Sequence, residues 1–291
     1  MIVKILRDIF HMIHILSLLL IHRIIGVGIA TIVFIIAFPI RLSAKILKIL
    51  PETKWKVNKN LRIRTSHLLD LWLNLFEYFV YPDFYPNKGD VILDIGSYIG
   101  GYTKLAASLV SPNGKVVAVE ANPVTYNYLL ANIADCDNFI KNMIEPIHAL
   151  VYSDEREIKF YIGLDKNAAS SIYVDHISYV EKIFNEQIDV KEIVLKSITI
   201  DNIIYGKNLH DVMLKIDTEG AELEILRGSI KSIKENRIKK AIIEIHEDIN
   251  NIIDIISFIK CIRPNSKASI AYKSVFYSLP YKKILYVDFN K

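Results

Sequence analysis

The feature that most constrains the fold is a strand, a glycine-rich turn, a helix and a second strand in direct succession. The apolar run Val91–Ile95 leads into the turn Gly96–Gly101. Tyr102–Val110 then predicts a helix, and a second apolar run, Lys115–Val119, ends at Glu120. Apolar runs without polar alternation are typical of strands buried in a parallel sheet. The segment therefore predicts a βαβ unit of an α/β fold that binds a ligand at the carboxyl edge of its sheet.

Three residues of this unit indicate which cofactor it takes. A dinucleotide site needs glycine at the third position of its turn so that the backbone can touch the pyrophosphate, and this chain has Tyr98 there. Asp94 would repel a phosphate and favours a cationic ligand such as S-adenosylmethionine. Glu120, 26 residues beyond Asp94, can accept hydrogen bonds from both hydroxyls of a ribose. The structural alternative is that the glycines only permit a tight turn and that Asp94 caps the helix.

The residues predicted to bind the cofactor follow the first three strands of the sheet. The third strand is expected near residues 146–151, and the Ser153-Asp154 pair behind it falls where adenine contacts are expected. The predicted set is Asp94, Gly96, Ser97, Tyr98, Gly100, Glu120, Ala121, Asn122, Ser153 and Asp154.

The catalytic candidates follow a later strand. Leu214–Asp217 is an apolar run that ends in a carboxylate, and Thr218–Arg227 is expected to be a helix. The end of this strand should lie beside the cofactor edge, where a hydroxyl nucleophile needs a base, so Asp217 is the leading catalytic candidate. Glu219 is the second. Together they could instead bind a hard divalent cation, although a required metal is disfavoured at this stage.

Other polar residues have simpler explanations. Glu222 and Glu224 fall in the first half of the expected helix, where the helix dipole favours acids. His246 follows the strand expected at Lys240–Glu244 and is interpreted as a solvent-facing polar residue. The long connection between residue 151 and Leu214 contains Ser170-Ser171 and is a candidate acceptor-binding insertion.

Three segments, VILDIGSYIGGYT, VVAVEANPVTYNYLLANI and LKIDTEGAELEILRG, together resemble the FkbM family of methyltransferases between Asp90 and His246. The resemblance implies a Rossmann-like class I methyltransferase fold, with a seven-stranded, mostly parallel sheet and helices on both faces. It also implies methyl transfer from S-adenosylmethionine to an oxygen, commonly a hydroxyl of a sugar or of a polyketide-like product. The sequence departs from the family at Ser97, often alanine, and at Asp201-Asn202, often an Asp-Asp pair, which leaves the role of Asp201 open.

The first 50 residues are expected to be an apolar helical membrane segment. Ile24–Ile40 is 17 residues without a charge, near the lower limit for a spanning helix. Ile9–Ile21 is also largely apolar, so one long helix, a hairpin and an interfacial helix followed by a span all remain open. Residues 51–64 are expected to be a basic linker, and residues 65–291 the methyltransferase domain. The structural alternative is an apolar helix packed on the domain or on a partner.

Charge is distributed unevenly along the chain. Residues 1–64 hold eleven Lys and Arg against two Asp and Glu, a net +9, so the remainder carries −5 of the total +4. A catalytic domain with an acidic balance disfavours a nucleic-acid partner. The excess of basic residues just after the apolar segment predicts, by the positive-inside tendency, a membrane-associated protein whose catalytic domain faces the cytoplasm. Two isolated cysteines indicate neither a disulfide framework nor a zinc site.

These patterns leave three classes of function. The favoured one is an S-adenosylmethionine-dependent methyltransferase that acts on a hydroxyl of a sugar, glycan or lipid-linked intermediate at the membrane. A non-catalytic membrane scaffold that kept the fold is the first alternative. An NAD-dependent Rossmann enzyme is the second, and Tyr98 and Asp94 disfavour it.

Overall fold

The computed structural model of the protein describes residues 53–56, 62–65, 84, 86–164, 167–184, 187–246, 251–273 and 282–290. The predicted membrane segment, residues 1–50, lies outside these ranges. Within them, no helix combines the length and the apolar character needed to span a bilayer.

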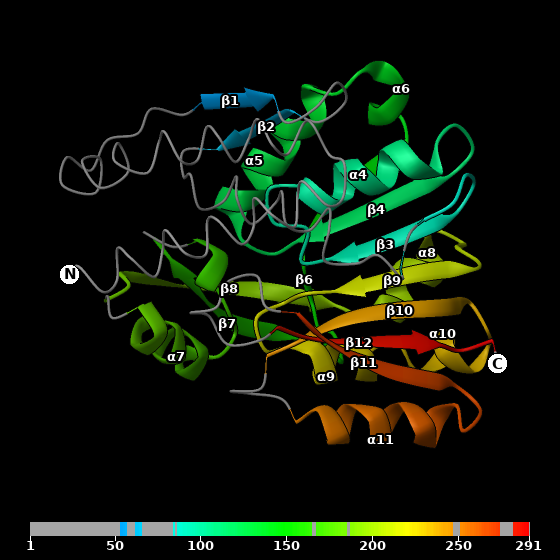
Figure 1. Ribbon diagram of the computed structural model, residues 1–291. Coiled ribbons are helices and arrows are strands. Elements are labelled where there is room, and N and C mark those ends of the chain that lie inside the picture. Colours follow the sequence, from blue (N-terminus) through cyan, green and yellow to red (C-terminus); the bar gives the residue numbers. More distant parts are fainter. Residues whose placement is uncertain are drawn as a thin grey trace.

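A seven-stranded sheet forms the centre of the molecule (Figure 1). Its strands are, in chain order, β3 (Val91–Ile95), β4 (Lys115–Glu120), β5 (Ile144–His148), β9 (Val212–Ile216), β10 (Ile238–Ile245), β11 (Lys267–Lys273) and β12 (Lys282–Asp288). The spatial order is β11-β12-β10-β9-β3-β4-β5. The five strands from β5 to β10 run parallel, and β12 is antiparallel to both of its neighbours. The predicted mostly parallel sheet is confirmed.

Helices cover both faces of the sheet because its strands alternate apolar side chains between two cores. Leu93, Leu214 and Ile243 pack on one face against helices α8 to α11. Ile92 and Met213 point to the other face, which α4, α5 and α6 cover. The described helices are α4 (Gly101–Val110), α5 (Pro123–Ala134), α6 (Asn138–Lys141), α7 (Val174–Phe184), α8 (Ile200–Gly206), α9 (Glu222–Arg227), α10 (Ile230–Lys234) and α11 (Ile252–Ile262).

A second sheet of three strands follows β5. It consists of β6 (Leu150–Val151), β7 (Glu157–Gly163) and β8 (Val190–Ile198), in the order β6-β8-β7. This sheet, a short 3-10 helix at Asn167–Ala169 and α7 make up the predicted insertion. Figure 1 shows β7, β8 and α7 at one end of the molecule.

Three element predictions need correction. The third strand, expected near residues 146–151, is divided into β5 and β6, which belong to different sheets. The expected helix at 218–227 begins only at Glu222, because Glu219 and Gly220 have positive φ values of 53° and 108° and bend the chain. The predicted linker at 51–64 contains strand β1 (Thr53–Lys56) and part of β2 (Arg62–Thr65), which pair antiparallel. Strand β2 lies against α5.

Caps explain where two of the helices begin. Thr199 and Asn202 form a reciprocal capping box at the start of α8, which satisfies backbone N–H groups that have no partner inside the helix. Asp201, whose role was open, accepts hydrogen bonds from the Lys231 and Ser232 N–H groups at 3.1 and 2.8 Å. Asp201 therefore ties α8 to the start of α10.

The parallel register brings four strand ends to one edge of the sheet. Ile95 pairs with Val119 on one side and with Ile216 on the other, and Ile216 pairs with Ile243. The residues that follow these positions, from four distant parts of the sequence, consequently meet at the carboxyl edge.

Candidate active site

The turn after β3, which we call the glycine turn (residues 96–100), lies directly against the end of β9. Gly96 has φ 77°, and a Cβ placed on it would lie 1.8 Å from the Asp217 carbonyl oxygen. Glycine is thus required here both by conformation and by space. Tyr98, at φ 53°, also has left-handed backbone. The glycine turn and the strand that carries Asp217 are therefore in contact through their backbones.

Glu120, at the end of β4, accepts three hydrogen bonds from the protein. The Tyr98 N–H donates to Oε2 at 2.8 Å, and the Asn122 N–H and Thr125 hydroxyl donate to Oε1, each at 2.9 Å. Burial raises the pKa of this carboxyl above its ordinary value, and the three donors oppose that rise. The glycine turn is thereby folded over the carboxylate.

Asp94 has its charge met inside the protein. The Thr103 hydroxyl donates to Oδ2 at 2.6 Å, and the Lys215 ammonium lies 3.2 Å from Oδ1. Lys215 is only 1% exposed, donates to the Gly96 carbonyl at 3.3 Å and lies 3.8 Å from Asp217 Oδ2. A buried lysine needs such partners. Asp94 therefore anchors Lys215 and the glycine turn, whereas the sequence predicted a carboxylate that faces the cofactor's positive charge.

The predicted residues Ala121 and Asn122 continue from Glu120 into α5. The Ala121 carbonyl lies 3.1 Å from His148 Nε2. Asn122 caps α5 through its Oδ1, and its amide donates to the Ser170 hydroxyl in the insertion at 3.1 Å.

Two predicted residues lie in the glycine turn itself. Ser97 is buried, and its hydroxyl donates to the Asp94 carbonyl at 2.9 Å. Gly100, at φ 89°, precedes α4 and packs against a side chain of α5.

Ser153 and Asp154 contact residues of the insertion and of α9. Asp154 pairs with Arg156 at 3.2 Å, and its carbonyl accepts a hydrogen bond from Ser197 on β8. The Ser153 backbone lies against Gly228, at the end of α9. These contacts attach the pair to the three-stranded sheet and to α9 rather than to Glu120.

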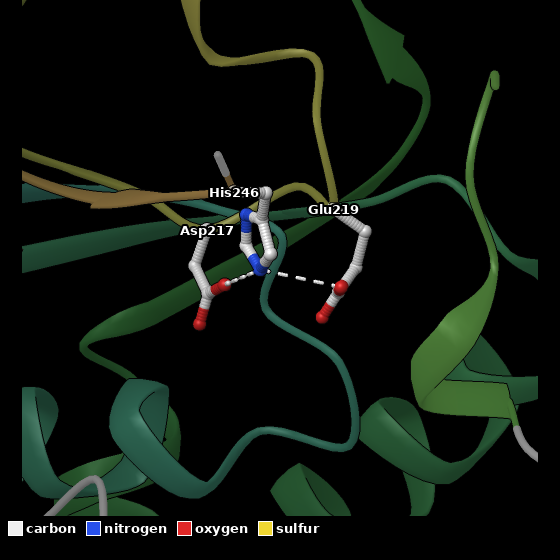
Figure 2. Close-up of side chains that lie close together, drawn as sticks. All are labelled: Asp217, Glu219 and His246. Carbon is white, nitrogen blue, oxygen red and sulfur yellow. Dashed lines mark ion pairs between the residues drawn. The ribbon is translucent and has the colours of Figure 1, made fainter. Parts of the chain in front are cut away.

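A cluster of carboxylates surrounds one histidine at the ends of β9 and β10. We call Asp217, Glu219, Glu222, Glu244 and His246 the carboxylate–histidine cluster. Figure 2 shows the Asp217 and Glu219 carboxylates on either side of the His246 ring. His246 Nε2 lies 3.2 Å from Glu219, 4.0 Å from Asp217 and 3.8 Å from Glu244. Both predicted catalytic residues are thus brought together, with a histidine between them.

His246 is held in place by Glu222. The fully buried Glu222 Oε1 lies 2.9 Å from His246 Nδ1 and also accepts the Gly220 N–H at 3.0 Å. Burial alone would lower the pKa of His246, but the carboxylates of Glu219, Glu222 and Glu244 raise it well above its ordinary value. The histidine is 13% exposed, so the prediction of a solvent-facing residue is wrong. Glu222 is hydrogen-bonded to His246, so its role is not limited to a favourable interaction with the helix dipole.

The insertion supplies a second histidine to this cluster. His176, on α7, is buried, and its Nε2 lies 2.6 Å from Glu219 Oε2. The Ser171 hydroxyl donates to the Glu219 carbonyl at 2.6 Å. Ser170 and Ser171 consequently link the insertion to Asn122 on one side and to Glu219 on the other. No motif marked His176 or Lys215 as site residues.

The family described as "Methyltransferase FkbM domain" matches residues 94–266. The chain belongs to this family. The match includes the glycine turn, Glu120 and the whole carboxylate–histidine cluster, and it confirms the resemblance seen in the sequence. No curated protein matches this chain.

A comparison with solved structures finds similar chains at low identity. The structure of methyltransferase FkbM from Methylobacillus flagellatus KT aligns with a TM-score of 0.50 at 16% identity, over 68% of this chain and 43% of that one. This chain thus spans less than half the length of that FkbM protein. Aeropyrum pernix fibrillarin with bound S-adenosyl-L-methionine aligns with a TM-score of 0.44 at 13% identity, over 81% of this chain and 82% of its own.

S-adenosylmethionine is the cofactor of this FkbM methyltransferase domain, and the residues at the sheet edge fit it. A carboxylate has about four acceptor directions, and the protein occupies three of those of Glu120. One acceptor direction of Glu120 therefore remains for a ribose hydroxyl. The sequence predicts that Glu120 accepts hydrogen bonds from both hydroxyls of the ribose. The membership in a methyltransferase family sets the NAD-dependent alternative aside.

Proposed function

We propose that this FkbM domain transfers a methyl group from S-adenosylmethionine to a hydroxyl oxygen. The observation that supports the proposal is the position of the carboxylate–histidine cluster, which shares the sheet edge with the glycine turn and Glu120. Asp217 is partly exposed and lies against Gly96 through its backbone. A base is consequently available beside the cofactor turn, as attack by a hydroxyl requires.

Asp217 is the proposed base. When bound, S-adenosylmethionine supplies a methyl group on a positively charged sulfur, and loss of that methyl leaves a neutral thioether. The acceptor oxygen forms the new carbon–oxygen bond as the carbon–sulfur bond breaks, and its proton passes to the Asp217 carboxylate. The Lys215 ammonium lies 3.8 Å from Asp217 Oδ2, and His246 Nε2 lies 4.0 Å from Asp217 Oδ1.

The acceptor we propose is a glycan or a lipid-linked intermediate at a membrane. The uncharged stretch Ile24–Ile40 and the basic residues after it support attachment to a membrane, with the catalytic domain on the cytoplasmic side. The insertion supports an acceptor site because Ser171 and His176 contact Glu219. The insertion also contacts the cofactor side of the sheet edge, where the Asn122 amide donates to the Ser170 hydroxyl.

The test is methyl transfer by the full-length protein from labelled S-adenosylmethionine to a membrane extract, followed by separation into lipid, glycan and protein fractions. Label in a lipid or glycan fraction that is stable to mild base and absent with Asp217→Asn supports the proposal. A protein that binds S-adenosylmethionine but labels no fraction favours the scaffold alternative. Fractionation of cells into membrane and soluble parts tests the proposed location.

A further inference from the structure

Within the described part of the chain, the carboxylate–histidine cluster brings together more carboxylates than imidazoles. Four carboxylates, Asp217, Glu219, Glu222 and Glu244, lie within 4.0 Å of His246, and His176 contacts Glu219. Counted over these six side chains, two negative charges remain even when both imidazoles are protonated. Lys215 adds no net charge because it also pairs with the buried Asp94. Like charges this close favour a bound cation.

Three of these residues offer ligand atoms at spacings that suit one ion. One atom each of Asp217, Glu219 and His246 lies within 4.8 Å of the others. Ligands about 2.1 Å from a metal are separated by about 3.0–3.4 Å in octahedral or tetrahedral geometry, and His246 Nε2 is already 3.2 Å from Glu219. Asp217, at 4.0 Å, would have to move closer to bind the same ion. The set combines one imidazole and two carboxylates, which suits Mn²⁺ and similar divalent ions.

Two neighbouring contacts hold these ligands in position. Glu222 accepts the hydrogen bond of His246 Nδ1, so a bound ion would replace the proton on Nε2. A histidine that binds metal almost always has such a partner on its other nitrogen. His176 holds Glu219 in the same way through its 2.6 Å contact. Glu222 and Glu244 are buried, whereas Asp217, Glu219 and His246 are partly exposed, so a bound ion would keep positions open toward the acceptor.

We propose that Asp217, Glu219 and His246 bind a divalent cation and that the acceptor hydroxyl is a further ligand of this ion. The proposal rests on methyl transfer to a hydroxyl as the function of the domain. The ion lowers the pKa of the hydroxyl it binds. The hydroxyl proton passes to the Asp217 oxygen that does not bind the ion, the oxygen attacks the methyl carbon, and the carbon–sulfur electron pair stays on sulfur. The sequence disfavours a required metal, and His246, interpreted from the sequence as solvent-facing, is the third ligand of the proposed site.

The experiment is a titration of the full-length, metal-free protein with Mn²⁺, followed by the electron paramagnetic resonance signal of the free ion. We expect one Mn²⁺ bound per chain, and at least about tenfold weaker binding by Glu219→Gln and by His246→Gln. Glu145→Gln is the matched control. Glu145 is a carboxylate on β5 held by Lys115 and Lys207, and its removal should leave Mn²⁺ binding unchanged.

Two outcomes of this titration overturn the metal site: no Mn²⁺ bound by the wild-type chain, or binding that is equal in wild type, Glu219→Gln and His246→Gln. Thermal unfolding of each variant checks that it is folded, and Asp217→Asn provides a third ligand variant if one of them is not. Calorimetric titration with S-adenosylmethionine on the same samples separates the two proposals. Cofactor binding and methyl transfer that persist in EDTA overturn the metal site alone. Mn²⁺ binding without cofactor binding overturns the proposed function and leaves the ion site standing.

Discussion

The glycine turn and the carboxylate–histidine cluster lie at the same sheet edge but differ in how their charges are met. Around the turn, Glu120 has three donors and Asp94 is paired with Lys215 and Thr103. In the cluster, four carboxylates face His246 among the described residues. Around the glycine turn, the carboxylates therefore already have partners within the protein. The cluster is a region of concentrated charge, which is where proton transfer and ion binding are expected.

The largest effect on activity should come from replacing Asp217, the proposed base. Asp217→Asn should lower kcat by about 10²–10⁴-fold, because the amide cannot accept the hydroxyl proton. The Kd for S-adenosylmethionine should stay unchanged. Steady-state kinetics and calorimetry measure the two quantities. Glu224→Gln is the control, since Glu224 pairs with Arg227 on α9 and should retain full activity. An Asp217→Asn enzyme with wild-type kcat would remove the functional difference between the two regions.

Lys215 connects the two regions, and its loss should destabilise the fold. Lys215→Met leaves Asp94 buried without its cation, which should cost about 3–5 kcal/mol of unfolding free energy. Chemical denaturation measures this quantity. Lys239→Met is the matched control because the Lys239–Asp90 pair is partly exposed and should contribute about 1 kcal/mol or less. Equal losses in the two variants would show that the buried pair has no special role.

Replacement of Glu120 tests cofactor binding at the glycine turn without changing the carboxylate–histidine cluster. Glu120→Ala should weaken S-adenosylmethionine binding by about ten- to a hundredfold, since it removes a charged acceptor and the support of Tyr98. Asp154→Asn sharpens the comparison. Asp154 was predicted to lie near the adenine but contacts Arg156 and Ser197, so this change should leave the Kd unaltered. Weaker binding of S-adenosylmethionine by Asp154→Asn would indicate that the Ser153-Asp154 pair contacts the cofactor.

The smallest effect is expected outside both regions. Lys115 and Lys207 lower the pKa of Glu145 below its ordinary value, so its stabilising contribution is present above the carboxyl's unfolded pKa and is lost as pH falls through the lowered folded value. Because the carboxylate is well exposed, Glu145→Gln should cost only about 0.5 kcal/mol at neutral pH. Urea unfolding of both proteins from neutral to acidic pH should show their stabilities converging. A constant difference would mean that charge is not the cause.

The same contrast explains how much the sequence could predict. The glycine turn is local: the strand, the turn and Glu120 follow one another, and their spacing alone predicts the βαβ unit and its edge. Lys215 could not be recognised, because a lysine inside an apolar run shows its role only when the fold places Asp94 beside it. His176 and His246 reach Glu219 from opposite sides of the sequence. Such long-range pairs leave no periodic pattern in a single chain.

The backbone at Tyr98 and Glu219 has a consequence for protein engineering. Both residues occupy the left-handed conformation, which disfavours any residue with a Cβ by about 1–2 kcal/mol. Glycine would relieve that strain at either position. Glycine at position 219 would also remove the partner of His176 and His246 and the carboxylate that is proposed to bind the ion. Relief of backbone strain and the proposed chemistry therefore favour different residues at position 219.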